Sequence, residues 1–282
     1  MFCALFGYSK QAYYKQQVHR DLQAGNRERA KALVLGVRRQ MPRLGARKLH
    51  HVLKHELGMG RDKLFSLLRN YGLLICRKRR YTATTNSRHW MRKYPNLVKG
   101  IELSRPEQIW VADITYIDTS EDGHGYLHLV TDAYSKQVMG YELCNNMEAS
   151  STLKALTMAI NNRKYNGPLI HHSDRGLQYC SKLYTDYLKQ HNIAISMTEN
   201  GDPYENAIAE RMNGILKDEF GLAEELNNIE QAGHQAQQSI QIYNTIRPHL
   251  SCHMLTPVQM HQQCKLKLPS YNKKAQTSLV DV

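Results

Sequence analysis

The first forty residues alternate polar and apolar positions at helical spacing. Residues 2–17 read as two short helices about a Gly-Tyr-Ser turn, with Ser9 as the N-cap of the second. Residues 19–40 are polar and helical in pattern, with one apolar edge: Leu33, Val34 and Val37. Pro42 ends this run, because proline has no backbone N–H for the helix ladder.

Two further helical segments follow, joined by a glycine-containing turn. From Gly45, four apolar residues recur at helical spacing: Leu49, Val52, Leu53 and Leu57. Gly58-Met-Gly60 breaks the pattern. In the next helix the inward positions are Leu64, Leu67 and Leu68, and the outward positions are Arg61, Lys63 and Arg69. Two helices about a glycine turn, the second basic, are typical of a DNA-binding helix-turn-helix, and a plain αα-hairpin is the alternative.

From Gln108 the pattern changes to strands. Gln108–Thr119 is rich in β-branched and aromatic residues, and two more strands after a Glu121–Gly125 turn complete an antiparallel meander: Tyr126–Ala133 and Gln137–Leu143. Met147–Arg163 is helical, with Asn145 or Asn146 as its cap. The next elements are a strand, a helix, a strand and a helix: Leu169–Ser173, Ser181–His191, Ile193–Met197 and about Pro203–Phe220. The order βββ-α-β-α-β-α predicts an α/β, ribonuclease H-like fold.

The last of these helices has two distinct faces. Asp202-Pro203-x-Glu205 is a capping-box-like start with proline at the first helical position. At about 100° per residue, four polar residues fall on one stripe: Asn206, Glu210, Asn213 and Lys217. Four apolar residues fall roughly opposite: Ile208, Met212, Ile215 and Leu216. We therefore expect the apolar face to dock on the sheet and the polar stripe to face outward to a cleft.

These patterns divide the chain into five segments. We expect a helix-turn-helix region, a basic linker, a ribonuclease H-like core, a helical extension of that core and a disordered tail: 1–75, 76–104, 105–222, 223–268 and 269–282. Within the extension, residues 224–248 are mostly polar and helical in pattern.

The charge is unevenly spread along the chain. The formal net charge is +13, of which residues 1–100 hold 23 Lys+Arg and 4 Asp+Glu (+19) and residues 101–282 hold 15 and 21 (−6). This favours a polyanion-binding front joined to a part that retains carboxylates, with a merely solvated basic surface as the alternative.

The segment 76–99 has eight basic residues and no acidic ones, with Tyr81, Trp90 and Tyr94 interleaved. We read it as a linker that follows phosphates and orders on DNA, rather than a merely flexible one. The predicted DNA contacts here are Arg77, Lys78, Arg79, Arg80, Arg88, Arg92 and Lys93. Those elsewhere are Arg61, Lys63, Arg175 and Lys217.

Composition excludes several other classes of protein. Hydrophobic residues make up 41% of the chain, and no apolar run approaches the roughly 18 residues of a membrane span. The start has no basic leader and too short an apolar run for a signal peptide. Six scattered cysteines without a Cys-x-x-Cys pair argue against a zinc finger or a disulfide framework and for a reducing cytosol.

Three carboxylates carry the predicted chemistry. Asp113 lies inside a strand on the side of Ile109, Val111 and Thr115, Asp174 ends a strand just before Arg-Gly, and Glu210 lies on the last helix. If the three converge, their repulsion is tolerable only with bound cations, and all-oxygen ligands favour Mg²⁺ or Mn²⁺ over Zn²⁺. Two ions ~3.5–4 Å apart would activate an attacking hydroxyl and stabilise the leaving oxygen of a phosphoryl displacement.

Each residue also has an ordinary structural alternative. Asp113 fits a surface strand position, Asp174 a turn cap with Gly176, and Glu210 an exposed helix position. For Lys217 the alternatives are a phosphate contact and an ordinary solvent-exposed lysine. For His171 and His172 the alternatives are orienting DNA or, for at least one of them, partial burial in a strand.

Three sequence blocks resemble the integrase catalytic core of insertion-sequence transposases. They are Trp110-x-x-Asp113-Ile-Thr-Tyr, His172-Ser-Asp174-Arg-Gly-x-Gln-Tyr179 and Glu205-Asn-Ala-x-Ala-Glu210-Arg-x-Asn-Gly-x-Leu-Lys217. The chain is most similar to the bacterial group encoded by two overlapping reading frames, of which it resembles the second (OrfB). That group's closing motif is matched by Tyr243-Asn-x-x-Arg247-Pro-His249 and Thr256-Pro257. The resemblance spans roughly Gly45 to His261.

The resemblance implies a DDE-type transposase with a retroviral-integrase-like fold. It implies Mg²⁺-dependent strand cleavage and transfer at the element's ends, with Asp113, Asp174 and Glu210 as the catalytic triad and Lys217 as the basic position seven residues later. Double-stranded DNA, at the element ends and at the target, is the expected partner. We also expect homo-oligomers on DNA and a location in the bacterial cytoplasm, at the nucleoid when bound.

The sequence departs from the family pattern in one respect. The upstream frame's helix-turn-helix and leucine zipper are absent, so we expect this chain to act with the upstream-frame product or as a fusion with it. The retroviral zinc-binding His/Cys module is also missing, consistent with no structural metal. The rival functions are a non-catalytic DNA-binding regulator, which does not require the carboxylates, and a structure-selective nuclease, which predicts no joining products.

Overall fold

The structure is a computed structural model that describes residues 7, 9–76, 90–199, 206–264 and 266–268. The chain divides into two compact units, Met1–Arg80 and Tyr81–Val282. Several sequence predictions lie outside the described residues: the first short helix, most of the basic linker including Arg77, Lys78, Arg79, Arg80 and Arg88, the Asp202–Glu205 helix start, and the tail 269–282. Among the described residues, no helix is both long and apolar enough to cross a membrane.

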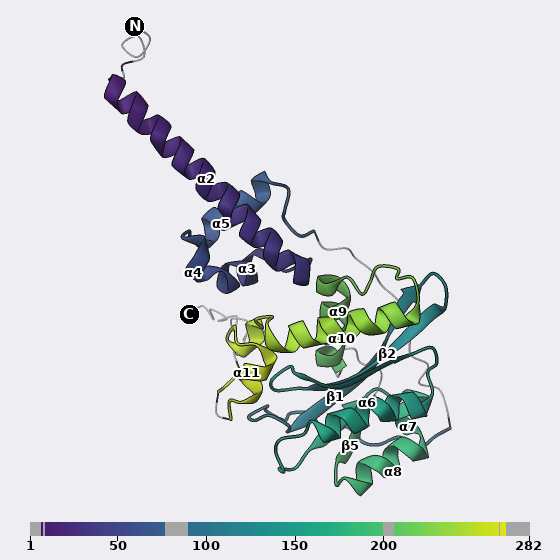
Figure 1. Cartoon of the computed structure of the whole chain (residues 1–282). Helices are drawn as coiled ribbons and strands as arrows, with labels where there is room; N and C mark the ends of the chain where they lie inside the picture. The colour runs from purple at the N-terminus through teal and green to yellow at the C-terminus, as the bar shows by residue number, and fades with distance from the viewer. Residues whose placement is uncertain (1–6, 8, 77–89, 200–205, 265, 269–282) are drawn as a thin grey trace, which may run out of the picture. The chain divides into compact units, whose positions relative to one another are not determined.

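The first unit is all helical (Figure 1). Ser9 is the N-cap of α2, as predicted, and its hydroxyl accepts a hydrogen bond from the Ala12 N–H. α2 then runs unbroken over Lys10–Gln40, so the prediction of two helices in this stretch was wrong. No proline interrupts these residues. A helix can therefore continue through polar sequence, because each backbone N–H still bonds to the carbonyl four residues earlier.

The stretch from Gly45 to Asn70, predicted as two helices about a glycine turn, contains three helices. They are α3 (Ala46–Val52), α4 (Lys54–Leu57) and α5 (Arg61–Asn70). α4 ends at Gly58, whose φ of +58° lies in the left-handed region that glycine adopts without strain. The inward leucines of α5 are buried together with Leu49 and Val34, and Arg61, Lys63 and Arg69 are exposed, as the periodicity predicted.

The second unit is built on one five-stranded sheet. Its strands are β1 (Ile109–Thr119), β2 (Gly123–Asp132), β3 (Val138–Cys144), β4 (Ile170–Ser173) and β5 (Ala194–Met197). The order across the sheet is β3-β2-β1-β4-β5. β1, β2 and β3 form the predicted antiparallel meander, and β4 and β5 add in parallel. The ribonuclease H-like prediction is confirmed.

Helices cover both faces of this sheet (Figure 1). They are α6 (Ala149–Asn161), α7 (Leu177–Cys180), α8 (Lys182–Gln190), α9 (Ala207–Phe220), α10 (Ile229–Thr245) and α11 (Pro257–His261). Trp110 and Ala112 face α6 and α8, whereas Ile109 and Val111 face Ala209 of α9. The alternation along β1 therefore puts Asp113 on the α9 side.

Two helix starts differ from the prediction. Glu148, not Asn145 or Asn146, is the N-cap of α6. The Asn146 side-chain oxygen instead accepts from the Glu148 N–H (3.4 Å) and the Ser151 hydroxyl (2.9 Å), so it ties the loop to the first turn from outside the helix. The described part of α9 begins at Ala207 with Asn206 as its N-cap. α7 is a single turn directly after β4, too short for periodicity to show.

Candidate active site

Asp113 lies in the interior of β1, paired with Leu129 of β2 and partly exposed. One carboxylate oxygen accepts from the Ile114 N–H at 2.9 Å. The other accepts from the side-chain amide of Asn213 on α9 at 2.6 Å. Both oxygens are therefore held, one by the strand and one by the helix that covers it.

Asp174 lies one residue beyond β4. β1 and β4 run parallel with Val111 opposite His172, and Asp113 and Asp174 each lie two residues farther along. Parallel register therefore brings the two carboxylates to the same end of neighbouring strands. Oδ1 of Asp174 accepts from the Gly176 N–H at 3.0 Å. Asp174 therefore makes the turn-capping hydrogen bond that was its structural alternative.

The charges of the three carboxylates act on one site. Burial raises the pKa of Asp113 to about 7, the negative charge of Asp174 adds to this, and Glu210 adds less. The Ile114 N–H and the Asn213 amide oppose the shift because they stabilise the ionised form. Burial also raises the pKa of Glu210. An ionised Asp113 is thus disfavoured here, and a nearby cation would offset that.

Glu210 is not the α9 side chain that meets Asp113. It is exposed in the first turn, and Asn213, one turn later, is buried and contacts the carboxylate. The polar stripe of α9 was predicted to face outward, which is wrong for Asn206 and Asn213. Both are buried against β1, since Asn206 donates to the Ala112 carbonyl at 3.3 Å. Within the described ranges, no three His, Cys, Asp or Glu side chains are grouped closely enough to hold a metal ion.

The donor chemistry still suits a hard cation. Asp113, Asp174 and Glu210 offer only oxygen, which Mg²⁺ and Mn²⁺ prefer. The raised pKa of Asp113 marks a place where positive charge would be stabilising. The assignment of Asp113, Asp174 and Glu210 as metal ligands stays a prediction.

Tyr179 lies near Asp113 and Asp174, and the sequence analysis assigned it no role. Its ring is buried against His171 and Tyr184, and its hydroxyl has no hydrogen-bond partner in the described part of the chain. Burial raises the pKa of this hydroxyl, and the charges of Asp113 and Asp174 raise it further. Only its position five residues after Asp174 in the second sequence block hinted at this placement.

The two histidines before Asp174 are structural. Both are buried, which agrees with the prediction that at least one of them is a buried strand histidine. Nε2 of His171 lies 2.8 Å from the Tyr184 hydroxyl, and Nδ1 of His172 lies 2.8 Å from the Ser196 hydroxyl. Burial, then His172, lowers the pKa of His171 to about 3, so His171 is neutral at physiological pH.

The predicted DNA contacts occupy three places. Arg175 and Lys217 are half-buried in the sheet-based unit, next to Asp174 and on α9 respectively. Arg92 and Lys93 are exposed before β1, and the Arg92 guanidinium lies 5.2 Å from the centre of the Tyr94 ring. Arg61 and Lys63 are exposed on α5 in the helical unit. The structure tests none of these as DNA contacts.

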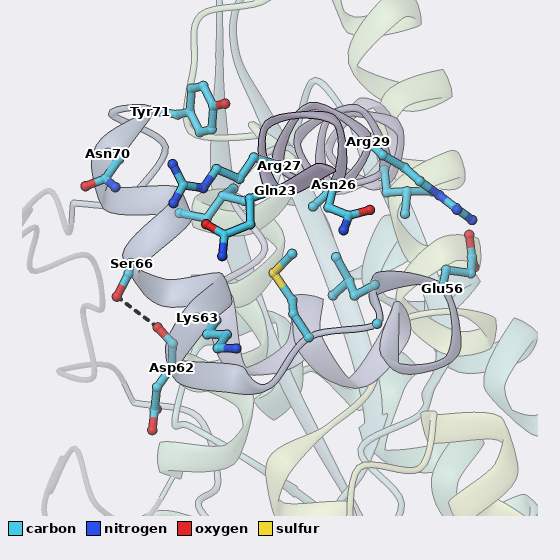
Figure 2. A pocket seen from close by; sticks show the side chains of 16 residues that line it. Gln23, Asn26, Arg27, Arg29, Glu56, Asp62, Lys63, Ser66, Asn70 and Tyr71 are labelled. Carbon is cyan, nitrogen blue, oxygen red and sulfur yellow. Dashed lines mark hydrogen bonds between the residues drawn. The ribbon is translucent and has the colours of Figure 1, made fainter. Parts of the chain in front are cut away.

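A recess of about 820 Å³ lies within the helical unit, between α2, the α4–α5 turn and α5. Figure 2 shows Gln23 and Arg27 of α2 on one side and Lys63 and Ser66 of α5 on another. Its charged lining is mixed: Arg27, Arg29, Lys63, Glu56 and Asp62. That mixture does not select a polyanion, and the carboxylate site lies in the other unit.

Comparison with known proteins gives concordant matches. Residues 104–203 and 191–257 each match a family model described as integrase core domain. A 31 kDa protein of insertion element IS600 from Shigella sonnei is 33% identical over 267 residues, 93% of this chain and 97% of its own length. Transposase InsF for insertion sequence IS3fB from Escherichia coli K12 is 35% identical over 198 residues, 70% of this chain and 68% of its own.

One solved structure extends the comparison to the fold. It is a chain of the simian T-cell lymphotropic virus intasome in complex with PP2A regulatory subunit B56 gamma. The match covers 83% of this chain and 77% of that chain, with a TM-score of 0.50 and 19% identity. At that identity it supports the architecture alone.

Proposed function

Because the chain belongs to the family of insertion-sequence transposases that carry an integrase core domain, we propose that it is a DDE-type transposase. Its reaction would be metal-dependent cleavage and transfer of DNA strands at the ends of an insertion element. One observation carries the proposal most directly: Asp113 and Asp174 stand at the same end of two parallel strands, where their charges act on each other.

In this proposal Asp113, Asp174 and Glu210 hold two Mg²⁺ or Mn²⁺ ions, because two-ion sites serve phosphoryl displacement. When bound, the metal supplies activation of the attacking hydroxyl and stabilisation of the leaving oxygen. The protein's own part is orientation. Asn213 and the Ile114 N–H fix the two oxygens of Asp113, and the Gly176 N–H fixes one oxygen of Asp174.

The remaining assignments concern DNA. Water attacks the phosphodiester in cleavage and a 3′ hydroxyl attacks in strand transfer, so no covalent protein–DNA intermediate forms. We assign phosphate contacts near the carboxylates to Arg175 and Lys217, and binding of the element end to residues 1–75 and the linker 76–104. The partners are double-stranded DNA, further copies of the chain and the upstream-frame product, in the bacterial cytoplasm.

The test is a cleavage and joining assay on double-stranded oligonucleotides that carry the element's ends, with Mg²⁺ or Mn²⁺. Asp174→Asn should abolish both products, because it removes a ligand charge beside Asp113. Asp186→Asn is the matched control, since Asp186 is a half-exposed aspartate of α8 whose carboxylate lies 3.4 Å from the Lys189 ammonium. Full activity of Asp174→Asn refutes the assigned role. Cleavage without joining favours a nuclease, and binding without either product favours a regulator.

A further inference from the structure

The closing motif of the chain, Tyr243-Asn-x-x-Arg247-Pro-His249, is distant in sequence from all three carboxylates. In the structure its side chains contact α9, the helix that carries Glu210, Asn213 and Lys217. We propose that Tyr243 and Arg247 are positioning residues that fix α9 against β1 and thereby set the metal affinity of the active site. The effect on metal affinity rests on the proposed function, whereas the fixing of α9 does not.

Arg247 holds the C-terminal end of α9. Its side chain is 1% exposed, and Nε and Nη2 donate to the two carboxylate oxygens of Glu219 at 2.7 and 2.8 Å. Such a two-point bond fixes orientation as well as distance. The guanidinium also lies 5.4 Å from the centre of the Tyr243 ring, so the ring limits its movement. Because the pair is largely buried, removing one partner leaves an uncompensated charge.

Tyr243 holds the middle of the same helix. It is fully buried, and its hydroxyl lies 2.9 Å from the Lys136 carbonyl, to which it donates, and 3.1 Å from the Met212 sulfur. Met212 immediately precedes Asn213, the residue that contacts Asp113. Tyr243 therefore joins α9 to the β2–β3 turn within one residue of the active-site contact.

A third bond runs from α10 to the C-terminal end of α9. The side-chain amide of Gln235 donates to the Phe220 carbonyl at 3.3 Å, one of the terminal carbonyls that the helix itself leaves unsatisfied. Gln235 and Tyr243 are eight residues apart on one side of α10, and Arg247 lies two residues beyond its end. Three contacts along α9 fix both its rotation and its position along its own axis.

Asn244, next to Tyr243, contacts a different element. Its side-chain oxygen accepts from the Val138 N–H and its amide donates to the Val138 carbonyl, both at 3.0 Å. These bonds attach α10 to the edge strand β3 and do not involve α9. Asn244 is thus a matched control in the same motif: its loss should weaken the packing of α10 without acting on α9 directly.

The consequence for the active site follows from helix geometry. Adjacent helical residues point about 100° apart, so a modest rotation of α9 would separate the Asn213 amide from Asp113. The 2.6 Å bond between Asn213 and Asp113 leaves little tolerance. Tyr243 and Arg247 oppose that rotation through Met212 and Glu219, which lie on a different face of the helix from Asn213.

The experiment compares Arg247→Gln, Tyr243→Phe and Asn244→Ala in the full chain. The first readout is the Mg²⁺ concentration that gives half-maximal strand cleavage. Arg247→Gln should raise it by about tenfold, as loss of supporting contacts around metal ligands typically does. Tyr243→Phe, which removes only a hydroxyl and keeps the ring, should raise it in the same direction. Asn244→Ala should lower thermal stability and leave the Mg²⁺ requirement unchanged.

The second readout is amide hydrogen exchange of residues 207–220, which needs no activity. Faster exchange there in Arg247→Gln and Tyr243→Phe, but not in Asn244→Ala, supports the fixing of α9. Equal changes in all three variants, or an unchanged Mg²⁺ requirement in Arg247→Gln, overturn the proposal. If the unaltered chain does not cleave DNA, the proposed function fails. The exchange data then decide separately whether Tyr243 and Arg247 hold α9.

Discussion

Replacing His261 by glutamine should change how the stability of the sheet-based unit depends on pH. His261 ends α11 and is 1% exposed. Its Nε2 lies 3.2 Å from a Glu107 carboxylate oxygen, and its Nδ1 lies 2.9 Å from the Ser135 hydroxyl and 3.8 Å from an Asp132 carboxylate oxygen. These contacts join the last helix to the two ends of the β1–β2 hairpin. Glutamine keeps a donor but never carries the charge.

The magnitude follows from the pKa of His261. Burial alone would lower it, but the hydrogen bonds and charges of Asp132 and Glu107 outweigh burial and raise the pKa to about 8. Relative to the ordinary 6.5, the shift corresponds to about 2 kcal/mol. Because the folded pKa is the higher one, this stabilisation is fully present below pH 6.5 and is lost as pH rises through about 8.

Other ionisable groups lie near His261. Arg163 lies 3.7 Å from the second Glu107 oxygen. Lys136, which donates to the Ala133 carbonyl, is buried, and burial lowers its pKa from the usual value near 10.5. The Tyr165 ring packs on His261, and burial raises the pKa of its hydroxyl.

Urea unfolding at a series of pH values measures the effect. The buried Trp110 reports on the sheet in a Trp90→Phe background, since Trp90 is exposed. The loss of unfolding free energy caused by His261→Gln should be about 2 kcal/mol larger near pH 6 than near pH 9. His171→Gln is the control, because His171 is equally buried but its pKa is lowered, so its loss should be smaller near pH 6 than near pH 9, the opposite direction. A pH-independent loss for His261→Gln would refute the reasoning.

Three further predictions concern packing, metal and DNA. Gly140→Ala should destabilise the unit by about 1–3 kcal/mol in urea, because a Cβ there would overlap the Ala155 carbonyl of α6. Gly214→Ala, with open space around it, should instead stabilise by about 0.5–1 kcal/mol, and equal effects would contradict the packing argument. Mg²⁺ should raise the melting temperature of the unaltered chain but not of Asp174→Asn, and an equal rise in both would argue against that ligand. In anisotropy titrations, the slope of log affinity against log salt concentration counts the phosphate contacts. Arg61→Ala and Lys63→Ala should each reduce that slope by about one contact, and an unchanged slope would exclude them as contacts.

Periodicity along the chain was sufficient for the elements of the sheet-based unit. The strands around Asp113 and before Asp174 fell where alternation and β-branched residues predicted them, because a half-covered strand must alternate along its own length. The same local logic placed Ser9 at the start of α2 and Gly58 at the end of α4. It overlooked α7, whose four residues make only about one helical turn.

Local pattern did not decide which partner covers each face. The polar stripe of α9 was predicted to face outward, yet the packing of α9 on β1 buries Asn206 and Asn213. That packing makes Asn213, rather than Glu210, the residue that contacts Asp113. A helical repeat in the sequence indicates that one side of a helix is polar. It does not indicate which part of the protein packs against that side.

Long-range charge pairs were equally invisible in the sequence. Glu107 and His261 are 154 positions apart, and Glu219 and Arg247 are 28 apart. No repeat or spacing in the sequence predicts such pairs, because each intervening helix or strand is determined by its own local pattern. The sequence alone indicated the family and most elements of the sheet-based unit, and it proposed the acidic residues of the site. The tertiary structure decided which buried charges are paired and which side chains hold the active-site helix, because those depend on distances that only the folded chain sets.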